Sequence, residues 1–150
     1  MTTTEDELEI RNVLARVAHI TDGRGSLEEY LTLWTEDSTW ESPVSGSFSG
    51  HQGHLDRHAK YQATGVQGPD AASFHLLTTV WVKVSGDEAE SMSSWLYVGN
   101  AQSEPKIEDI GTYTDTLRRT PEGWKLASRK VTQGSGEWLQ RKAAEAAERS

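Results

Sequence analysis

Asp22 and His75 are the two residues whose types and positions best fit proton-transfer chemistry. A neutral imidazole can take a proton from a substrate near neutral pH. A carboxylate on its other ring nitrogen fixes the tautomer and stabilises the imidazolium that forms. Asp22 ends an expected helix and His75 begins an expected long strand, and such ends can meet at the mouth of a cone. We therefore expect the two side chains to lie within hydrogen-bond reach, about 2.6 to 3.2 Å, inside an apolar cavity.

A purely structural interpretation of the same residues stays open. Asp22 directly precedes Gly23-Arg24-Gly25, so its carboxylate could simply cap a turn. His75 could be a half-buried strand histidine whose hydrogen bonds are satisfied by the fold. The elements that would position the pair therefore have to be considered next.

The first half of the chain predicts helices. Apolar residues at three- and four-residue steps predict a helix from Glu5 to about Thr21, which Gly23 and Gly25 end. The S-x-x-E sequence beginning at Ser26 predicts the start of a second helix. Its apolar stripe is expected to contain Leu27, Tyr30, Leu31 and Trp34.

A short strand, a turn and a polar helix are expected next. The strand is Thr39 to Ser42, the Ser/Gly-rich turn is Pro43 to Gly50, and the helix runs from His51 to about Gln62. Because the helix is polar, we expect it to form a solvated lid over the rest of the fold.

The second half predicts a sheet. Four long runs rich in β-branched and aromatic residues predict consecutive antiparallel strands at 73–85, 88–100, 107–119 and 124–132, and a helix is expected at 137–149. This order predicts an α+β fold in which a curved antiparallel sheet wraps around the N-terminal helices to form a cone with an internal pocket. We expect residues 1–150 to form one such domain, with 1–4 and about 143–150 peripheral or frayed.

Composition and charge exclude several classes of function. The chain has 15 Lys and Arg against 23 Asp and Glu, so its net charge is −8. Such a surface repels phosphate backbones and anionic lipid, and we therefore expect neither nucleic acid nor membrane as a partner. The absence of cysteine excludes disulfides and thiolate chemistry. The acidic N-terminal sequence is unlike a signal peptide, which favours a cytoplasmic location.

Three blocks of the sequence resemble a known family. They are D-x-x-x-S-L-x-x-Y-L-x-L-W-T-E-D-S-T-W from Asp22 to Trp40, H-L-L-T-T-V-W-V-K-V-S-G-D-E-A from His75 to Ala89, and the segment from Gly111 to Arg129. Together they resemble the SnoaL-like group of the nuclear transport factor two-like superfamily, whose members have the cystatin-like cone fold.

The resemblance implies an activity. Asp22 and His75 are similar to the dyad of scytalone dehydratase and lindane dehydrochlorinase, which remove a proton with loss of water or halide. A cofactor-independent lyase or isomerase is therefore expected, acting on a small, mostly apolar substrate that could be cyclic, polyketide-like or steroid-like. Because the fold also carries other functions, a polyketide cyclase and a non-catalytic module that binds a small molecule or a partner stay open as alternatives.

Five further residues are candidates for binding the substrate. The Tyr30 hydroxyl could orient a substrate oxygen, and Tyr97 could place a hydroxyl deep in the cavity on the strand face of Trp95. Trp40 and Trp95 could form walls against a flat apolar substrate. Arg129 could bind a carboxylate or a departing halide. For each of these residues an ordinary role in the core or in a rim ion pair is the alternative.

A metal site is not expected. His54 and His58 have the i, i+4 spacing that places two imidazoles on one helix face, but Leu55 stands where the H-E-x-x-H motif requires Glu. The roles of His51, His54 and His58 stay open, and proton abstraction by the dyad needs no cofactor.

Self-association is expected. Strict alternation along the first long strand would place Phe74, Leu76, Thr78, Val80, Val82 and Val84 opposite the His75 face. Such an apolar stripe needs covering, which predicts a homodimer or another homo-oligomer.

Overall fold

The computed structural model describes residues 3–133 and 137–150. Its elements are α1 (Thr3–Thr21), α2 (Leu27–Thr32), β1 (Trp34–Ser42), β2 (Gly46–Ser49), α3 (Gly50–Ala63), β3 (Phe74–Ser85), β4 (Glu88–Gly99), β5 (Lys106–Thr120), β6 (Gly123–Gln133) and α4 (Glu137–Glu148). The long helices and strands predicted from the sequence are all present, and the α+β fold class is confirmed.

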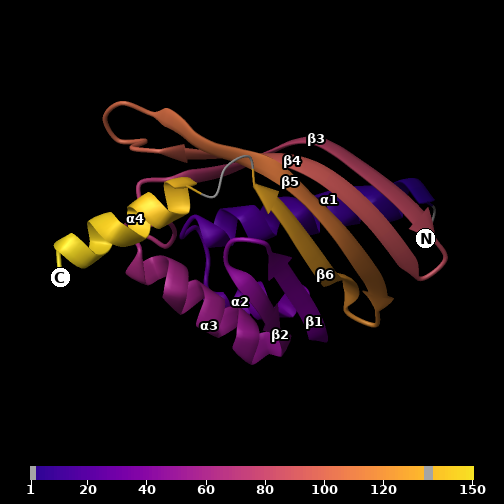
Figure 1. Ribbon diagram of the computed structural model, residues 1–150. Coiled ribbons are helices and arrows are strands. Elements are labelled where there is room, and N and C mark those ends of the chain that lie inside the picture. Colours follow the sequence, from indigo (N-terminus) through magenta and orange to yellow (C-terminus); the bar gives the residue numbers. More distant parts are fainter. Residues whose placement is uncertain (1–2, 134–136) are drawn as a thin grey trace.

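The strands form one curved, open sheet in the order β2-β1-β6-β5-β4-β3. All neighbouring strands are antiparallel except β1 and β6, which are parallel. Figure 1 shows β3 to β6 arching over α1, while α3 packs beside β1 and β2. The sheet and these helices therefore pack around a common interior, as expected for a cone.

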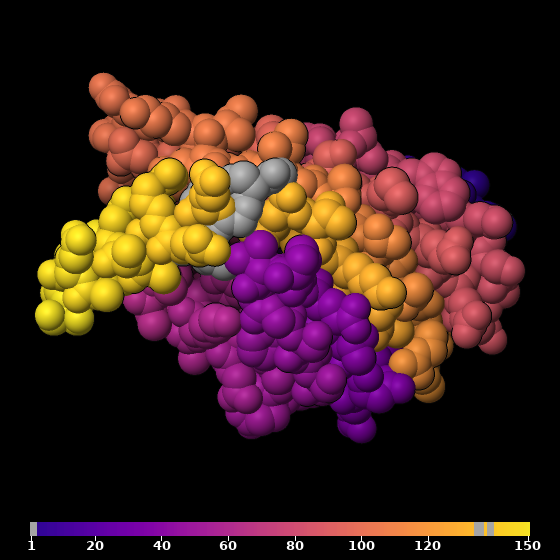
Figure 2. Space-filling model, in the orientation of Figure 1, coloured from indigo at the N-terminus to yellow at the C-terminus, as the bar shows by residue number. Residues whose placement is uncertain are grey.

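The C-terminal helix α4 lies at the periphery. Figures 1 and 2 show it projecting from the end of the molecule at which the loop between β4 and β5 also lies. Residues 143–148, expected to be peripheral or frayed, are helical. The Lys142 ammonium lies 3.6 Å from the Glu108 carboxylate of β5, which links α4 to the sheet. No helix within residues 3–133 and 137–150 is long and apolar enough to cross a bilayer.

A β-bulge divides β3 into two halves that face opposite ways. Thr78 pairs with Ser94 and Trp81 with Met92, so two β3 residues oppose one residue of β4 between these pairs. Thr79 absorbs the extra residue with a positive φ of 47°. The predicted continuous outer stripe is therefore wrong beyond Thr78. Beyond the bulge, Val80, Val82 and Val84 contact the core, and Trp81 is 52% exposed.

Three further expectations need correction. Trp34 begins β1 instead of ending the second helix, because α2 stops after six residues. The expected turn at 43–50 contains the short strand β2, which pairs with β1. Helix α3 is not a solvated lid, since one of its faces is buried in the fold. That face consists of His54, Arg57, His58 and Tyr61.

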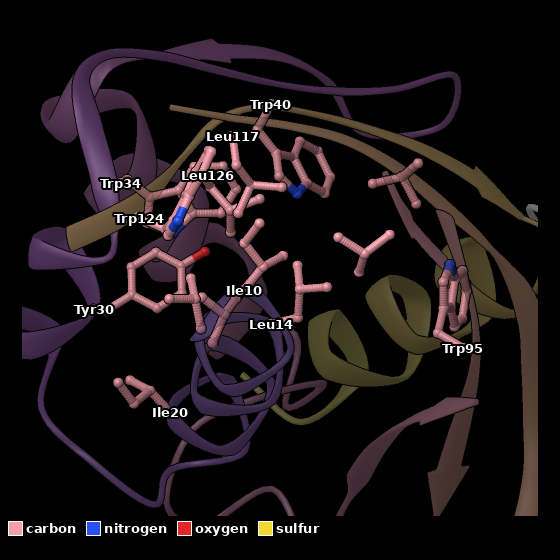
Figure 3. Packing of buried hydrophobic residues seen from close by; sticks show 14 of the residues in the cluster. Ile10, Leu14, Ile20, Tyr30, Trp34, Trp40, Trp95, Leu117, Trp124 and Leu126 are labelled. Atoms are coloured by element: carbon pink, nitrogen blue, oxygen red, sulfur yellow. The ribbon is translucent and has the colours of Figure 1, made fainter. Parts of the chain in front are cut away.

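The buried core is centred on α1. Figure 3 shows Ile10 and Leu14 between a group of aromatic side chains on one side and Trp95 on the other. Ile10, Leu14 and Leu126 are at most 1% exposed. Large rings bury on the order of 150 to 250 Å² each, so the buried Trp34, Trp40, Trp95 and Trp124 compensate for a modest aliphatic content.

The start of α1 is fixed to the turn between β5 and β6 by Asp6. Its carboxylate accepts hydrogen bonds from Arg119 Nη1 at 2.7 Å, Arg119 Nη2 at 3.0 Å and Trp124 Nε1 at 2.9 Å. The hydrogen bonds from Arg119, and then that from Trp124, lower the pKa of Asp6 below its ordinary value of 3.8. The charged carboxylate therefore stabilises the folded state.

We predict that Asp6→Asn lowers the thermal midpoint at pH 7. Because the folded-state pKa is depressed, the wild-type advantage should be complete well above pH 3.8 and should disappear as the pH falls through the lower folded-state pKa. Urea unfolding of both proteins from pH 7 down to about pH 2 measures this difference. Asp70→Asn, which changes an exposed loop carboxylate, is the matched control. A difference that is independent of pH would contradict the assignment.

Candidate functional site

Two hydrogen bonds join Asp22, at the end of α1, to His75 of β3. The Asp22 Oδ1 atom lies 2.6 Å from His75 Nδ1, and Asp22 Oδ2 accepts the His75 backbone N–H at 2.8 Å. The expected hydrogen-bonding distance is therefore confirmed. The Asp22 side chain is 3% exposed and the His75 side chain 12%. With both Asp22 oxygens engaged, the imidazole is fixed in position as well as in tautomer.

The chain around Asp22 explains how the carboxylate reaches β3. Asp22 N still donates to Ala18 O at 3.1 Å, so the residue lies on the last turn of α1. Gly23 then adopts a φ of 82°, and a Cβ at this position would lie 2.4 Å from the Pro69 backbone. Arg24 stacks over the Phe74 ring and lies 3.5 Å from Asp22 Oδ2. The glycine turn thus permits close packing of α1, β3 and the loop before β3.

His75 contributes to the wall of an internal cavity of about 50 Å³. A water molecule needs roughly 10 to 15 Å³ by this measure, so the cavity has room for a few water molecules or for a small organic group. Within the described chain, His75 Nε2 has no hydrogen-bond partner. Because Nδ1 is turned toward Asp22, Nε2 is the nitrogen available to a molecule in the cavity. The lining residues are Thr21, Tyr30, Trp40, Ser42, Arg57, Tyr61, Val66, Gln67, His75, Trp95, Tyr113, Arg129, Val131 and Gln133.

Arg129 and Asp115 form a buried ion pair in the wall formed by the sheet. Arg129 Nε and Nη2 donate to the two Asp115 oxygens at 2.7 and 2.8 Å. Burial opposes the charge of Arg129, but Asp115 overrides this effect and raises the arginine pKa above its usual range. The guanidinium also stacks 3.9 Å from the Tyr113 ring centroid. Arg129 is therefore a buried residue with its own counterion, and not part of a rim ion pair.

Arg57 enters the same cavity from α3. It is 4% exposed, its Nη2 donates to the Tyr30 hydroxyl at 2.6 Å, and the same nitrogen lies 3.2 Å from His58 Nε2. Its guanidinium stacks over the Trp40 ring at 4.8 Å. The Tyr30 hydroxyl is thus bound to a cation at the cavity wall.

Four of the five predicted substrate-binding residues line the cavity: Tyr30, Trp40, Trp95 and Arg129. Tyr97 does not. Its ring packs edge-on against His75 with 5.1 Å between ring centroids, and burial raises its pKa to about 12. Tyr97 therefore packs against the imidazole without lining the cavity.

Sequence reasoning missed several lining residues, of which Arg57 and Tyr61 carry a recognisable signal. With His54 and His58 they recur at steps of three and four residues, which places all four on one helix face. The polarity of these side chains concealed that this is the buried face. Tyr113 and Asp115 carry no such signal, because only the course of β5 past β6 brings them to Arg129.

The buried histidines of α3 are neutral. Burial, and then the charge of Arg57, lower the pKa of His54 to about 3 and that of His58 to about 2. His54 Nε2 lies 3.0 Å from Ser38 Oγ, and His58 Nδ1 lies 2.7 Å from Gln67 Nε2. Within the described parts of the chain, no three or more His, Asp or Glu side chains form a group that could hold a metal ion.

Solved structures of similar fold include proteins with different descriptions. An NTF2-like protein with a cystatin-like fold from Novosphingobium aromaticivorans is 25% identical, with 91% of this chain and 88% of that chain covered and a TM-score of 0.72. The hexachlorocyclohexane dehydrochlorinase LinA-type3 from Novosphingobium barchaimii is 18% identical, with 88% of each chain covered and a TM-score of 0.73. A protein of unknown function from Mycobacterium tuberculosis is 20% identical, with 97% of each chain covered and a TM-score of 0.74.

The sequence comparisons identify the family. No curated protein matches the chain. The family model described as "SnoaL-like domain" matches residues 2–130, which include α1, the whole sheet up to Arg129 and both members of the Asp22–His75 pair. Together with the cystatin-like cone of the structural neighbours, this match shows that the chain belongs to the SnoaL-like domain family.

Proposed function

We propose that the protein is a cofactor-independent lyase or isomerase in which His75 removes a proton from carbon. The observation that carries this proposal is the bonding of Asp22, whose two oxygens hold the ring and the backbone of His75 while Nε2 is left for the cavity. A histidine with only a packing role would not need one hydrogen bond from Asp22 to its ring and a second to its backbone. This arrangement supports general base catalysis, since the base is oriented before the substrate arrives.

In the elimination reaction, His75 Nε2 takes the proton of a C–H bond. The electron pair of that bond forms the carbon–carbon double bond, and the leaving group on the adjacent carbon departs with its own bonding pair. Asp22 stabilises the imidazolium through Nδ1–H. A departing halide leaves as the anion, and the imidazolium then gives its proton to solvent. A departing hydroxyl group takes the proton from the His75 imidazolium and leaves as water. In an isomerisation the proton returns to another carbon of the same substrate.

The cavity wall supplies groups suited to the leaving group or to a developing oxyanion. The Tyr30 hydroxyl can donate to a substrate oxygen because its own oxygen already accepts from Arg57. Burial raises the pKa of Tyr113 to about 12, so this phenol also remains a hydrogen-bond donor at neutral pH. Trp40 and Trp95 provide apolar walls. These side chains suit a substrate with an apolar body and at least one polar group.

The structural neighbours include a relevant reaction class. The dehydrochlorinase from Novosphingobium barchaimii acts on hexachlorocyclohexane by its name, and loss of hydrogen chloride is an elimination of the kind proposed. We extend the reaction class to this chain on the strength of its own Asp22–His75 geometry. The substrate itself is a matter for experiment.

We predict that His75→Gln lowers the elimination rate at least about 10³-fold and Asp22→Asn by about 10³- to 10⁴-fold, because Asn favours the wrong tautomer. The probes are 3-chlorobutanoate, followed by chloride release, and 4-hydroxybutan-2-one, followed by formation of the conjugated enone. His19→Gln, which changes an exposed histidine of α1, should keep the wild-type rate. Variants of the pair that retain the rate, with folding verified by circular dichroism, would refute the mechanism.

We also predict a spectroscopic signature of the pair that needs no substrate. In proton–nitrogen spectra at neutral pH, His75 should carry its proton on Nδ1, and Asp22→Asn should abolish this preference. His51, which bonds to the Trp34 carbonyl, serves as an internal reference. If the preference is present but every elimination probe is inert, a cyclase or a module that only binds its ligand becomes the better assignment. If the preference is absent from the wild type, the pair is not organised for catalysis.

We propose in addition that the outer face of the sheet pairs with a second copy of the chain. Large apolar side chains that adjoin one another on this face are 38% to 53% exposed. Monomeric proteins rarely expose a large contiguous apolar patch of this kind. They come from three adjacent strands and belong to Phe74, Leu76, Trp81, Met92 and Ile110.

Wild-type protein should therefore sediment as a dimer or a larger oligomer at micromolar concentration, and Leu76→Lys with Trp81→Lys should shift it to the monomer. Introduced lysines would have to be buried without partners, which weakens the interface. Leu8→Lys is the matched control, because Leu8 is an exposed leucine of α1. A wild-type monomer in analytical ultracentrifugation would contradict the proposal.

A further inference from the structure

Arg57 is a buried cation without a counterion among the residues that the structure describes. No ion pair joins its guanidinium to any carboxylate in the described chain, and only 4% of the residue is exposed. Nη2 bonds to Tyr30 and faces His58. The Nε atom is buried without a hydrogen-bond partner, and Nη1 has none among residues 3–133 and 137–150. Two of the three guanidinium nitrogens are therefore unused in the free protein.

The groups around Arg57 do not supply the missing negative charge. Arg129 is matched by Asp115, whose two oxygens it occupies. On α3 itself, His54 and His58 are neutral near pH 7. On the aromatic side, Tyr30 accepts a hydrogen bond as a neutral phenol and Trp40 offers only its ring face. Of the other buried carboxylates beside the cavity, Asp22 is engaged twice by His75, and Asp109 accepts hydrogen bonds from Gln133 Nε2 and from the Ile110 backbone N–H.

An unpaired buried charge is costly, and this cost falls when an anion binds it. Taking an ion out of water costs several kcal/mol unless another charge and hydrogen bonds compensate it. A guanidinium N–H group without a protein partner can donate a charge-assisted hydrogen bond to a carboxylate oxygen. A neutral ligand would fill the space but would leave the charge uncompensated. The cavity should therefore discriminate strongly between an acid and its amide.

We infer that the substrate carries a carboxylate, which accepts a hydrogen bond from Arg57 Nη1 while His75 Nε2 faces a C–H bond of the same molecule. The inference rests on the proposed function for the role of His75, and it assigns Arg57 as the residue that selects and orients the substrate. The substrate class is thus a small carboxylic acid with an apolar body. One substrate molecule can contact Arg57, Tyr30 and His75 together, because all three side chains line one cavity.

Binding of propionate and of propionamide, measured by ligand-detected NMR titration at neutral pH, tests this inference without any turnover. The two probes have nearly the same shape and differ in charge. Wild-type protein should bind propionate at least about tenfold more tightly than propionamide. Arg57→Gln should abolish this preference. Arg57→Lys, which keeps the charge but lacks the planar fork, should retain part of the preference.

Two matched controls separate this result from other effects. Lys130→Gln removes a positive charge from the exposed face of β6, one residue from Arg129, and should retain the full preference. His75→Gln should also retain it, so that the outcome is independent of whether the elimination assay succeeds. Thermal unfolding provides a second measurement, since propionate should raise the midpoint of the wild type and not that of Arg57→Gln.

Several outcomes would overturn the inference. Equal affinity of the wild type for the acid and the amide would exclude a carboxylate site. A preference that survives Arg57→Gln in a folded protein would move the site to another residue. Chloride that binds through Arg57 more tightly than propionate would assign Arg57 to a departing halide and not to a substrate carboxylate.

Discussion

The two-oxygen contact between Asp22 and His75 ties the end of α1 to the beginning of β3, and much of the site depends on it. One carboxylate oxygen fixes the backbone of the strand and the other fixes the imidazole. The helix that supplies this carboxylate is also the centre of the hydrophobic core, through Ile10 and Leu14. The position of the base is consequently determined by the packing of the whole cone. A carboxylate on a loose loop could hold the same tautomer, but it would not hold the same position.

The interior of the cone is unusually polar for a chain of this size. A paired arginine, an unpaired arginine, two neutral histidines and the Asp22–His75 pair all lie around or beside one cavity. The charge of Arg57 contributes to keeping His54 and His58 neutral, so these histidines neither compete as bases nor repel the His75 imidazolium. Of the three histidines His54, His58 and His75, it is His75, whose neighbour is a carboxylate, that is placed to gain a proton during a reaction. The division of roles among the histidines follows from the sign of the charge next to each.

The sequence was sufficient for the features that depend on local pattern. The periodicity of α1, the S-x-x-E cap at Ser26 and the long β-branched runs predicted elements that the structure contains, and Ser26 Oγ indeed accepts from the Glu29 backbone N–H at 3.1 Å. Features that depend on tertiary context were missed. Arg57 was hidden because a polar helix face normally lies in solvent, and this one is buried only because α3 packs against the rest of the fold. The pairing of Arg129 with Asp115 requires the register between β5 and β6, which no local pattern encodes.

The bulge at Thr79 has a consequence for how relatives of this chain should be aligned. On the His75 side of the bulge, odd-numbered positions of β3 face the cavity, and on the other side even-numbered positions face the core. A relative that lacks the extra residue would need a one-position gap there. An alignment without that gap would match its inward residues to outward ones along half of the strand. Substitution patterns drawn from such an alignment would exchange constraints of the core with those of the outer surface, so the gap has to be placed by structure before such patterns are interpreted.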